Sequence, residues 1–237
     1  MSAPSDTGGQ GPTSFGGAPA PAPSPALLKA VQEMKPVRMR SRFTAFVIVL
    51  AFGLIWPALT MILRPMRQDL PGLPRMWVLA GALVWGAVFV VSLAAALVPR
   101  RGDVLPGAGR ASRVSFVGML IVFLFALFFS TSVPGLSLEP ADRGWTLFDS
   151  CVHCVGYVFR VAGVFLVVGV IVLRRLMPVG ARRIGMALGA AGGAMAGLAL
   201  HFICPFAGTD HVVLSHVGGM ALAAAAGAAL LPSFLER

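Results

Sequence analysis

Six long apolar stretches restrict this chain to a helical fold inside a membrane. Each is close to the ~20 residues that an α-helix needs to cross the hydrocarbon core. Strands of a membrane barrel would alternate apolar and polar residues, whereas these stretches are apolar on every side. We therefore predict an all-α integral membrane protein, a bundle of six transmembrane helices. The predicted spans are Thr44–Leu63, Trp77–Val98, Val114–Val133, Val155–Leu173, Ile184–Ile203 and Val212–Leu231.

The composition agrees with a membrane protein and the charge pattern gives an orientation. Only 12% of the residues are charged, against about 25% in a typical soluble domain. The net charge of +10 could indicate nucleic-acid binding, but the basic residues concentrate in alternate loops. By the positive-inside rule, both termini are then cytoplasmic, and no direct nucleic-acid partner is expected. The outer loops contain four basic residues, Arg64, Arg67, Arg75 and Arg143. The inner segments contain fourteen, Lys29, Lys35, Arg38, Arg40, Arg42, Arg100, Arg101, Arg110, Arg113, Arg174, Arg175, Arg182, Arg183 and Arg237.

The segment before the first span divides into two parts. Residues 1–24 are rich in Pro, Gly, Ala and Ser, which predicts a disordered leader. Residues 25–42 predict a short amphipathic helix with a basic end, followed by the transmembrane domain, residues 43–237. This helix would either lie on the lipid headgroups or dock on a cytoplasmic partner. Its apolar stripe consists of Leu27, Leu28, Val31 and Met34.

All of the cysteines and histidines lie in two short windows. Thiols and imidazoles bind soft metals and carry redox chemistry, so their confinement in an apolar chain indicates one site. In the predicted topology both windows face outward. The alternative is that the histidines only hydrogen-bond across helices and the cysteines pack as small apolar residues. The first window holds Cys151, His153 and Cys154, and the second holds His201, Cys204, His211 and His216.

Small residues recur along the last two spans and lead to two of these histidines. A four-residue repeat of glycines forms one helix face that lets a neighbouring helix approach closely. Both His201 and His216 are therefore expected to point into the bundle. The repeat in the fifth span is Gly185, Gly189, Gly193 and Gly197, and His201 is its next position; the sixth span has His216, Gly219, Ala223 and Gly227.

Arg160 is a further ionisable residue inside a predicted span. It lies one helical turn beyond Tyr157, which is itself one turn beyond His153. Ionisable groups inside membranes are costly and are often functional. Alternatively, a long arginine side chain reaches outward to the headgroups. Both interpretations of Arg160 stay open at this stage.

The spacing of the cysteines limits the chemistry. Attachment of c-type haem needs His directly after the second Cys, and Val155 stands there. A zinc site would need four ligands, available from Cys151, Cys154 and Cys204 with His201 or His211. The sequence indicates no definite cofactor, and a transient soft or transition metal ion at this cluster is the candidate ligand. The competing enzymatic class is a membrane thiol–disulfide oxidoreductase using Cys151 and Cys154.

Several of these features together resemble the NrsF-like anti-sigma factors of bacterial inner membranes. They are the Leu27-Leu28-x-Ala30 helix before Lys35-Pro36-Val37-Arg38, the six spans, and Leu200-His201-x-x-Cys204-Pro205 followed by His216. The resemblance extends from about Pro25 to the C-terminus. It departs from the family pattern in the second cysteine of the first window, in His211 and in the long leader.

The resemblance implies a regulator without catalytic turnover. Its cytoplasmic N-terminal segment would hold an extracytoplasmic-function sigma factor, which favours the docking interpretation of residues 25–42. Periplasmic cysteines would sense metal or oxidative stress. The implied sensing pair is Cys204 with Cys151 or Cys154, and we favour Cys154 because it lies closer to the fourth span.

Overall fold

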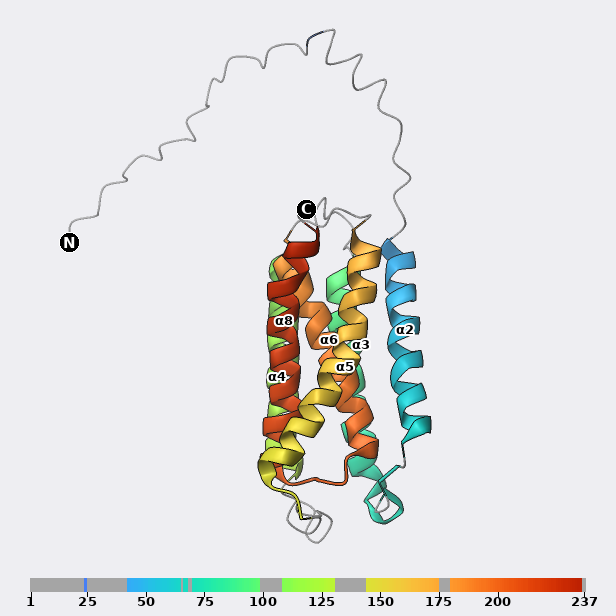
Figure 1. Cartoon of the computed structure of the whole chain (residues 1–237), viewed down its shortest axis with the longest axis vertical. Helices are drawn as coiled ribbons and strands as arrows, with labels where there is room; N and C mark the ends of the chain where they lie inside the picture. The colour runs from blue at the N-terminus through green and yellow to red at the C-terminus, as the bar shows by residue number, and fades with distance from the viewer. Residues whose placement is uncertain are drawn as a thin grey trace, which may run out of the picture. The chain divides into compact units, whose positions relative to one another are not determined.

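The structure, a computed structural model, describes residues 24, 42–64, 66–67, 70–98, 108–130, 144–174 and 180–235. The regular secondary structure of these residues is entirely helical (Figure 1). Apart from Ser24 and Arg42, the predicted leader and docking segment, with Leu27, Leu28, Val31 and Met34, lie outside the described residues. The elements are α2 (Arg42–Leu63), η1 (Leu70–Gly72), α3 (Arg75–Leu97), α4 (Ala108–Ser130), α5 (Leu147–Leu173), α6 (Ala181–Ile203), α7 (Thr209–His211), η3 (Val212–Val217) and α8 (Gly218–Leu235).

The prediction of an all-helical fold with six spans is confirmed. Six helices are long and apolar enough to cross a membrane, and the last consists of α7, η3 and α8 in succession. α5 begins at Leu147, eight residues before the predicted span. Its start is fixed by a capping box, in which Thr146 Oγ1 accepts from the Asp149 backbone N–H at 3.1 Å and the Asp149 carboxylate accepts from the Thr146 N–H. The first Cys/His window therefore lies on a helix.

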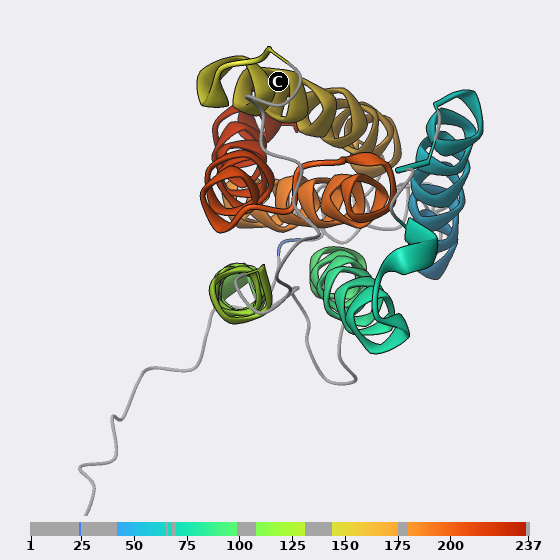
Figure 2. The ribbon, with the colours of Figure 1, turned by 90° about the horizontal axis from the view of Figure 1, so that it is seen from below.

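α6 is the central helix of the bundle. Within its apolar span 78% of the residues are buried, against 17% in α2. Helices α3, α5 and α8 pack around α6 (Figure 2). Gly and Ala dominate its sequence, so neighbouring backbones can approach from several sides.

The glycine repeat of α6 forms the contact with α8 over three of its four positions. A Cβ atom on Gly185 would overlap the backbone carbonyl oxygen of Gly227, and one on Gly189 would overlap that of Ala223. At Gly193 it would lie 2.7 Å from the Cα atom of Met220. The fourth position, Gly197, instead accommodates the ring of Trp85 from α3. The predicted small-residue face is thus shared between two neighbouring helices.

Candidate metal centre

Four buried side chains from the ends of three spans converge on one point. Cys154 comes from α5, Cys204 from the segment after α6, and His211 and His216 from α7 and η3. One ligand atom from each lies within 4.8 Å of the others. The Sγ atoms of Cys154 and Cys204 are 3.7 Å apart, and His211 Nε2 is 3.4 Å from Cys204 Sγ. All three cysteines of the chain are free thiols.

The π-helix η3 brings His211 and His216 to the same site. In an α-helix with 3.6 residues per turn, residues five apart point about 140° away from each other. A π-helix has i→i+5 hydrogen bonding, so residues at this spacing lie one above the other. The two imidazole rings have their centroids 5.4 Å apart in an edge-on arrangement. The local widening of the helix thus supplies two ligands from one turn.

Ser150 orients the imidazole of His211. The Ser150 hydroxyl donates to the Leu147 carbonyl oxygen at 2.8 Å. Its oxygen, 3.1 Å from His211 Nδ1, therefore accepts a hydrogen bond from the Nδ1–H group. This tautomer leaves the lone pair of Nε2 directed toward Cys204. Histidines that bind metals typically have their second nitrogen held in this way.

The four side chains match the chemistry of a tetrahedral metal site. Two cysteines and two histidines are a common zinc ligand set. With Zn–S bonds of 2.3 Å, a tetrahedron requires sulfur atoms about 3.8 Å apart, close to the observed 3.7 Å. His216 Nε2 is buried without a hydrogen-bond partner among the described residues, and such an atom often indicates a water or an ion. The cluster could therefore bind a metal ion.

Cys204 is the most favourable of the thiols for metal binding. Hydrogen bonding from the Cys154 thiol holds the pKa of the Cys204 thiol well below its usual range, although burial opposes this shift. A thiolate is the form that binds metals and attacks oxidants.

Most of the chain matches one known protein family. The family NrsF, described as "Negative regulator of sigma F", matches residues 31–236. The chain belongs to the NrsF family. Searches of curated proteins and of solved structures gave no significant match. The family description indicates a negative regulator of a sigma factor, which favours a regulatory over a catalytic role.

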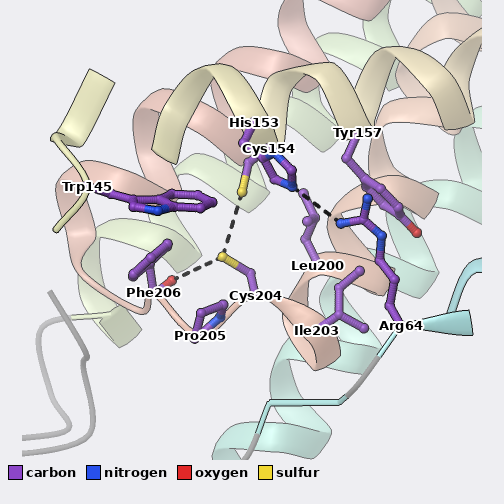
Figure 3. Close-up of a pocket in the computed structure, with 10 residues that line it drawn as sticks. All are labelled: Arg64, Trp145, His153, Cys154, Tyr157, Leu200, Ile203, Cys204, Pro205 and Phe206. Atoms are coloured by element: carbon purple, nitrogen blue, oxygen red, sulfur yellow. Dashed lines mark hydrogen bonds between the residues drawn. The ribbon is translucent and has the colours of Figure 1, made fainter. Parts of the chain in front are cut away.

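A cavity of about 320 Å³ leads to the thiols of this NrsF-family protein. Figure 3 shows Trp145 and Phe206 on one side of Cys154 and Cys204, and Arg64 and Tyr157 on the other. His153 is exposed, and its Nε2 lies 3.3 Å from Arg64 Nη1. The predicted site residue His153 therefore lines the approach to the cluster and is not one of its four ligands.

Two other predicted site residues, His201 and Cys151, are not ligands of the four-residue Cys/His cluster. His201 is buried, but its Nε2 lies 3.2 Å from the Val78 carbonyl oxygen and its ring is 4.5 Å from Trp77. It therefore joins α6 to α3, and His211 is the histidine beside Cys204. Cys151 is half-buried and is not among the four ligands.

The two predicted polar residues of α5 differ in environment. Tyr157 is buried, with its hydroxyl 2.6 Å from Thr60 Oγ1, and so joins α5 to α2. Arg160 is exposed and donates through Nε to the Gly156 carbonyl oxygen at 3.2 Å. Its exposure agrees better with a side chain that reaches outward than with one paired inside the bundle.

Two features of the site, Ser150 and the π-helix, were not predicted from the sequence. Ser150 lies four residues before Cys154, so a helical start at Thr146 would have placed both on one face. No feature of the sequence indicated the π-helix at Val212–Val217. The sequence placed His211 and His216 in one predicted site but could not show that the π-helix brings them together as two of its four ligands.

Proposed function

We propose that this chain is a membrane-bound anti-sigma factor that acts on a sigma factor of the extracytoplasmic-function class. Its cytoplasmic N-terminal segment would sequester the sigma factor, and the outward Cys/His cluster would trigger release when it meets a metal ion or an oxidant. The observation that carries the proposal is a four-ligand Cys/His cluster inside a member of a family of sigma-factor regulators. A membrane regulator of this kind needs a site that responds to conditions on the side of the membrane opposite the cytoplasm. Thiols and imidazoles that can bind a metal ion or react with an oxidant would provide such a site.

Metal binding offers a direct way to move the helices. The four ligands come from α5, from the segment after α6, and from the start of the last span. An ion bound by all four would hold these three helix ends together. Because a ligand shifts an equilibrium only through different affinities for its two states, the resting state would have the four ligands less well aligned.

Oxidation of the same two thiols is the second trigger we propose. A hydroperoxide would oxidise the Cys204 thiolate to a sulfenic acid and be reduced to the alcohol. The Cys154 thiol would then displace water to form a Cys154–Cys204 disulfide. The 3.7 Å separation of the sulfur atoms needs only a small movement for this bond.

The geometry supports the alternative oxidoreductase function less well. That function would use Cys151 and Cys154 as the active dithiol. Cys154 instead has its sulfur against Cys204, and Cys151 stands outside the cluster. Cys154 and Cys204 would therefore be the reactive pair, with Cys151 as a bystander.

The proposed topology has both termini in the cytoplasm and the cluster on the opposite side. The start of α2 and the end of α8 lie at one end of the bundle, and α5 begins at the other (Figure 1). Reporter fusions after Arg237 and between Leu138 and Arg143 should report opposite compartments, with the first in the cytoplasm. The same compartment for both fusions would contradict this arrangement.

The docking segment can be tested by binding. Leu28→Asp combined with Val31→Asp should weaken sigma-factor binding about thirtyfold, the effect of losing an apolar hot spot, and should release the sigma factor without stress. Gln32→Asp adds one negative charge outside the apolar stripe and should bind normally. Co-purification from membranes and a sigma-dependent reporter measure both effects. If deletion of residues 1–42 leaves binding and repression unchanged, this segment is not the output element.

A further inference from the structure

A second cavity lies between α3 and α4 and shares no lining residue with the cavity at the thiols. It is an apolar groove of about 480 Å³, within the ~300–1,000 Å³ range of ligand sites. Its walls include Leu83 and Val91 from α3 and Val117 and Ile121 from α4, all of them exposed in the bundle. Both helices are membrane spans, so the groove opens toward lipid.

One wall of the groove has an unsatisfied polar atom. Ser92 is only 1% exposed, and its hydroxyl has no hydrogen-bond partner among the described residues. Ser92 faces α4 at Gly118, where an added Cβ atom would lie 3.8 Å from Ser92 Oγ and 2.9 Å from Val88 Cγ1. A buried hydroxyl without a partner is costly in an apolar medium. An occupant with a hydrogen-bond acceptor at this depth would satisfy it.

The groove ends at a cationic side chain. Arg113 lines it from the second turn of α4 and is exposed. This is the end of the bundle at which α4 and α6 begin, and it also carries Arg110, Arg182 and Arg183. The groove is therefore apolar along most of its length, has one hydroxyl near one end and has a guanidinium beyond it.

We propose that this groove binds an anionic phospholipid. Arg113 would contact the phosphate, the Ser92 hydroxyl would donate to an ester carbonyl oxygen of the glycerol, and one acyl chain would fill the groove toward Leu83 and Ile121. This order of groups matches that of a phospholipid from headgroup to chain. Basic residues between spans favour acidic headgroups over neutral ones. The site is separate from the Cys/His cluster and does not depend on the proposed sensing function.

The test uses the full-length protein in mild detergent with equal amounts of phosphatidylglycerol and phosphatidylcholine of identical acyl chains. Native mass spectrometry counts the lipids retained. Phosphatidylglycerol should be retained preferentially, and Arg113→Gln should reduce this preference about fivefold, as expected for one arginine at a headgroup. Ala87→Phe, at an exposed residue of the groove wall, should block retention of either lipid.

Two control variants accompany the test, and three outcomes would overturn the proposal. Arg110→Gln removes the same charge one turn earlier, outside the groove lining, and Ala221→Phe adds the same ring to an exposed position of α8. Both should retain phosphatidylglycerol like the parent. Equal retention of the two lipids by the parent protein would overturn the proposal. So would loss of preference in the Arg110 variant equal to that in the Arg113 variant, or a bound quinone released from the groove.

Discussion

Replacing Cys204 with Ser should abolish binding of one Zn²⁺ or Cd²⁺ ion per chain to the reduced protein. Cys204 has its sulfur near both Cys154 and His211, so its loss removes the ligand that the others surround. His211→Ala should have a comparable effect. Binding can be measured on detergent-solubilised protein by competition with a chromophoric chelator, and the stoichiometry by elemental analysis. In cells, Cys204→Ser should keep the sigma factor bound and prevent its release by stress.

Graded variants separate a metal centre from a simple pair of reactive thiols. Ser150→Ala keeps all four ligands but removes the hydrogen bond to His211, and should weaken metal binding about 10–100-fold. Cys151→Ser removes a thiol from the same helix outside the cluster and should bind metal like the parent. A site made only of thiols would respond to Cys151→Ser and ignore His211→Ala. That pattern would contradict the four-ligand centre.

Replacing Gly189 with Ala should strongly destabilise the bundle. The added methyl group would overlap the Ala223 carbonyl oxygen and lie 2.9 Å from the Ala224 Cα atom. Backbone atoms cannot rotate away, so α8 must move, at a cost of about 1–3 kcal/mol or more. Thermal unfolding in detergent should shift down by roughly 5–10 °C at the upper end of this range. Metal affinity should fall as well, because η3, which carries His216, continues directly into α8.

Gly163→Ala is the matched control for this substitution. Gly163 is also inside a spanning helix, but an added Cβ atom there has no neighbour within 4 Å. The change should leave stability unaltered or raise it by about 0.5–1 kcal/mol through helix propensity. If both alanine variants unfold at the same temperature, the close approach of α6 and α8 does not limit stability.

The sequence by itself determined the number of spans and the fold class. A run of about 20 apolar residues forms an α-helix in lipid, because every backbone polar group must be paired within the segment. The repeat from Gly185 to Gly197 likewise predicted a face of close packing, since only glycine lets two helix backbones approach to this distance. Both features depend only on local composition and on the spacing of residues along the chain, so the sequence alone is enough to predict them.

Only the tertiary structure decided which cysteines and histidines meet. Cys154 and Cys204 are 50 residues apart, and their approach depends on how α5 packs against α6. His201 has the spacing of a site residue, yet it turns toward Trp77 and the Val78 carbonyl oxygen of α3. His211 takes the place beside Cys204 because the π-helix at Val212–Val217 rotates it there. The rotation of a helix and its local widening into a π-helix arise from packing against neighbouring helices. A hydropathy pattern therefore predicts neither of them.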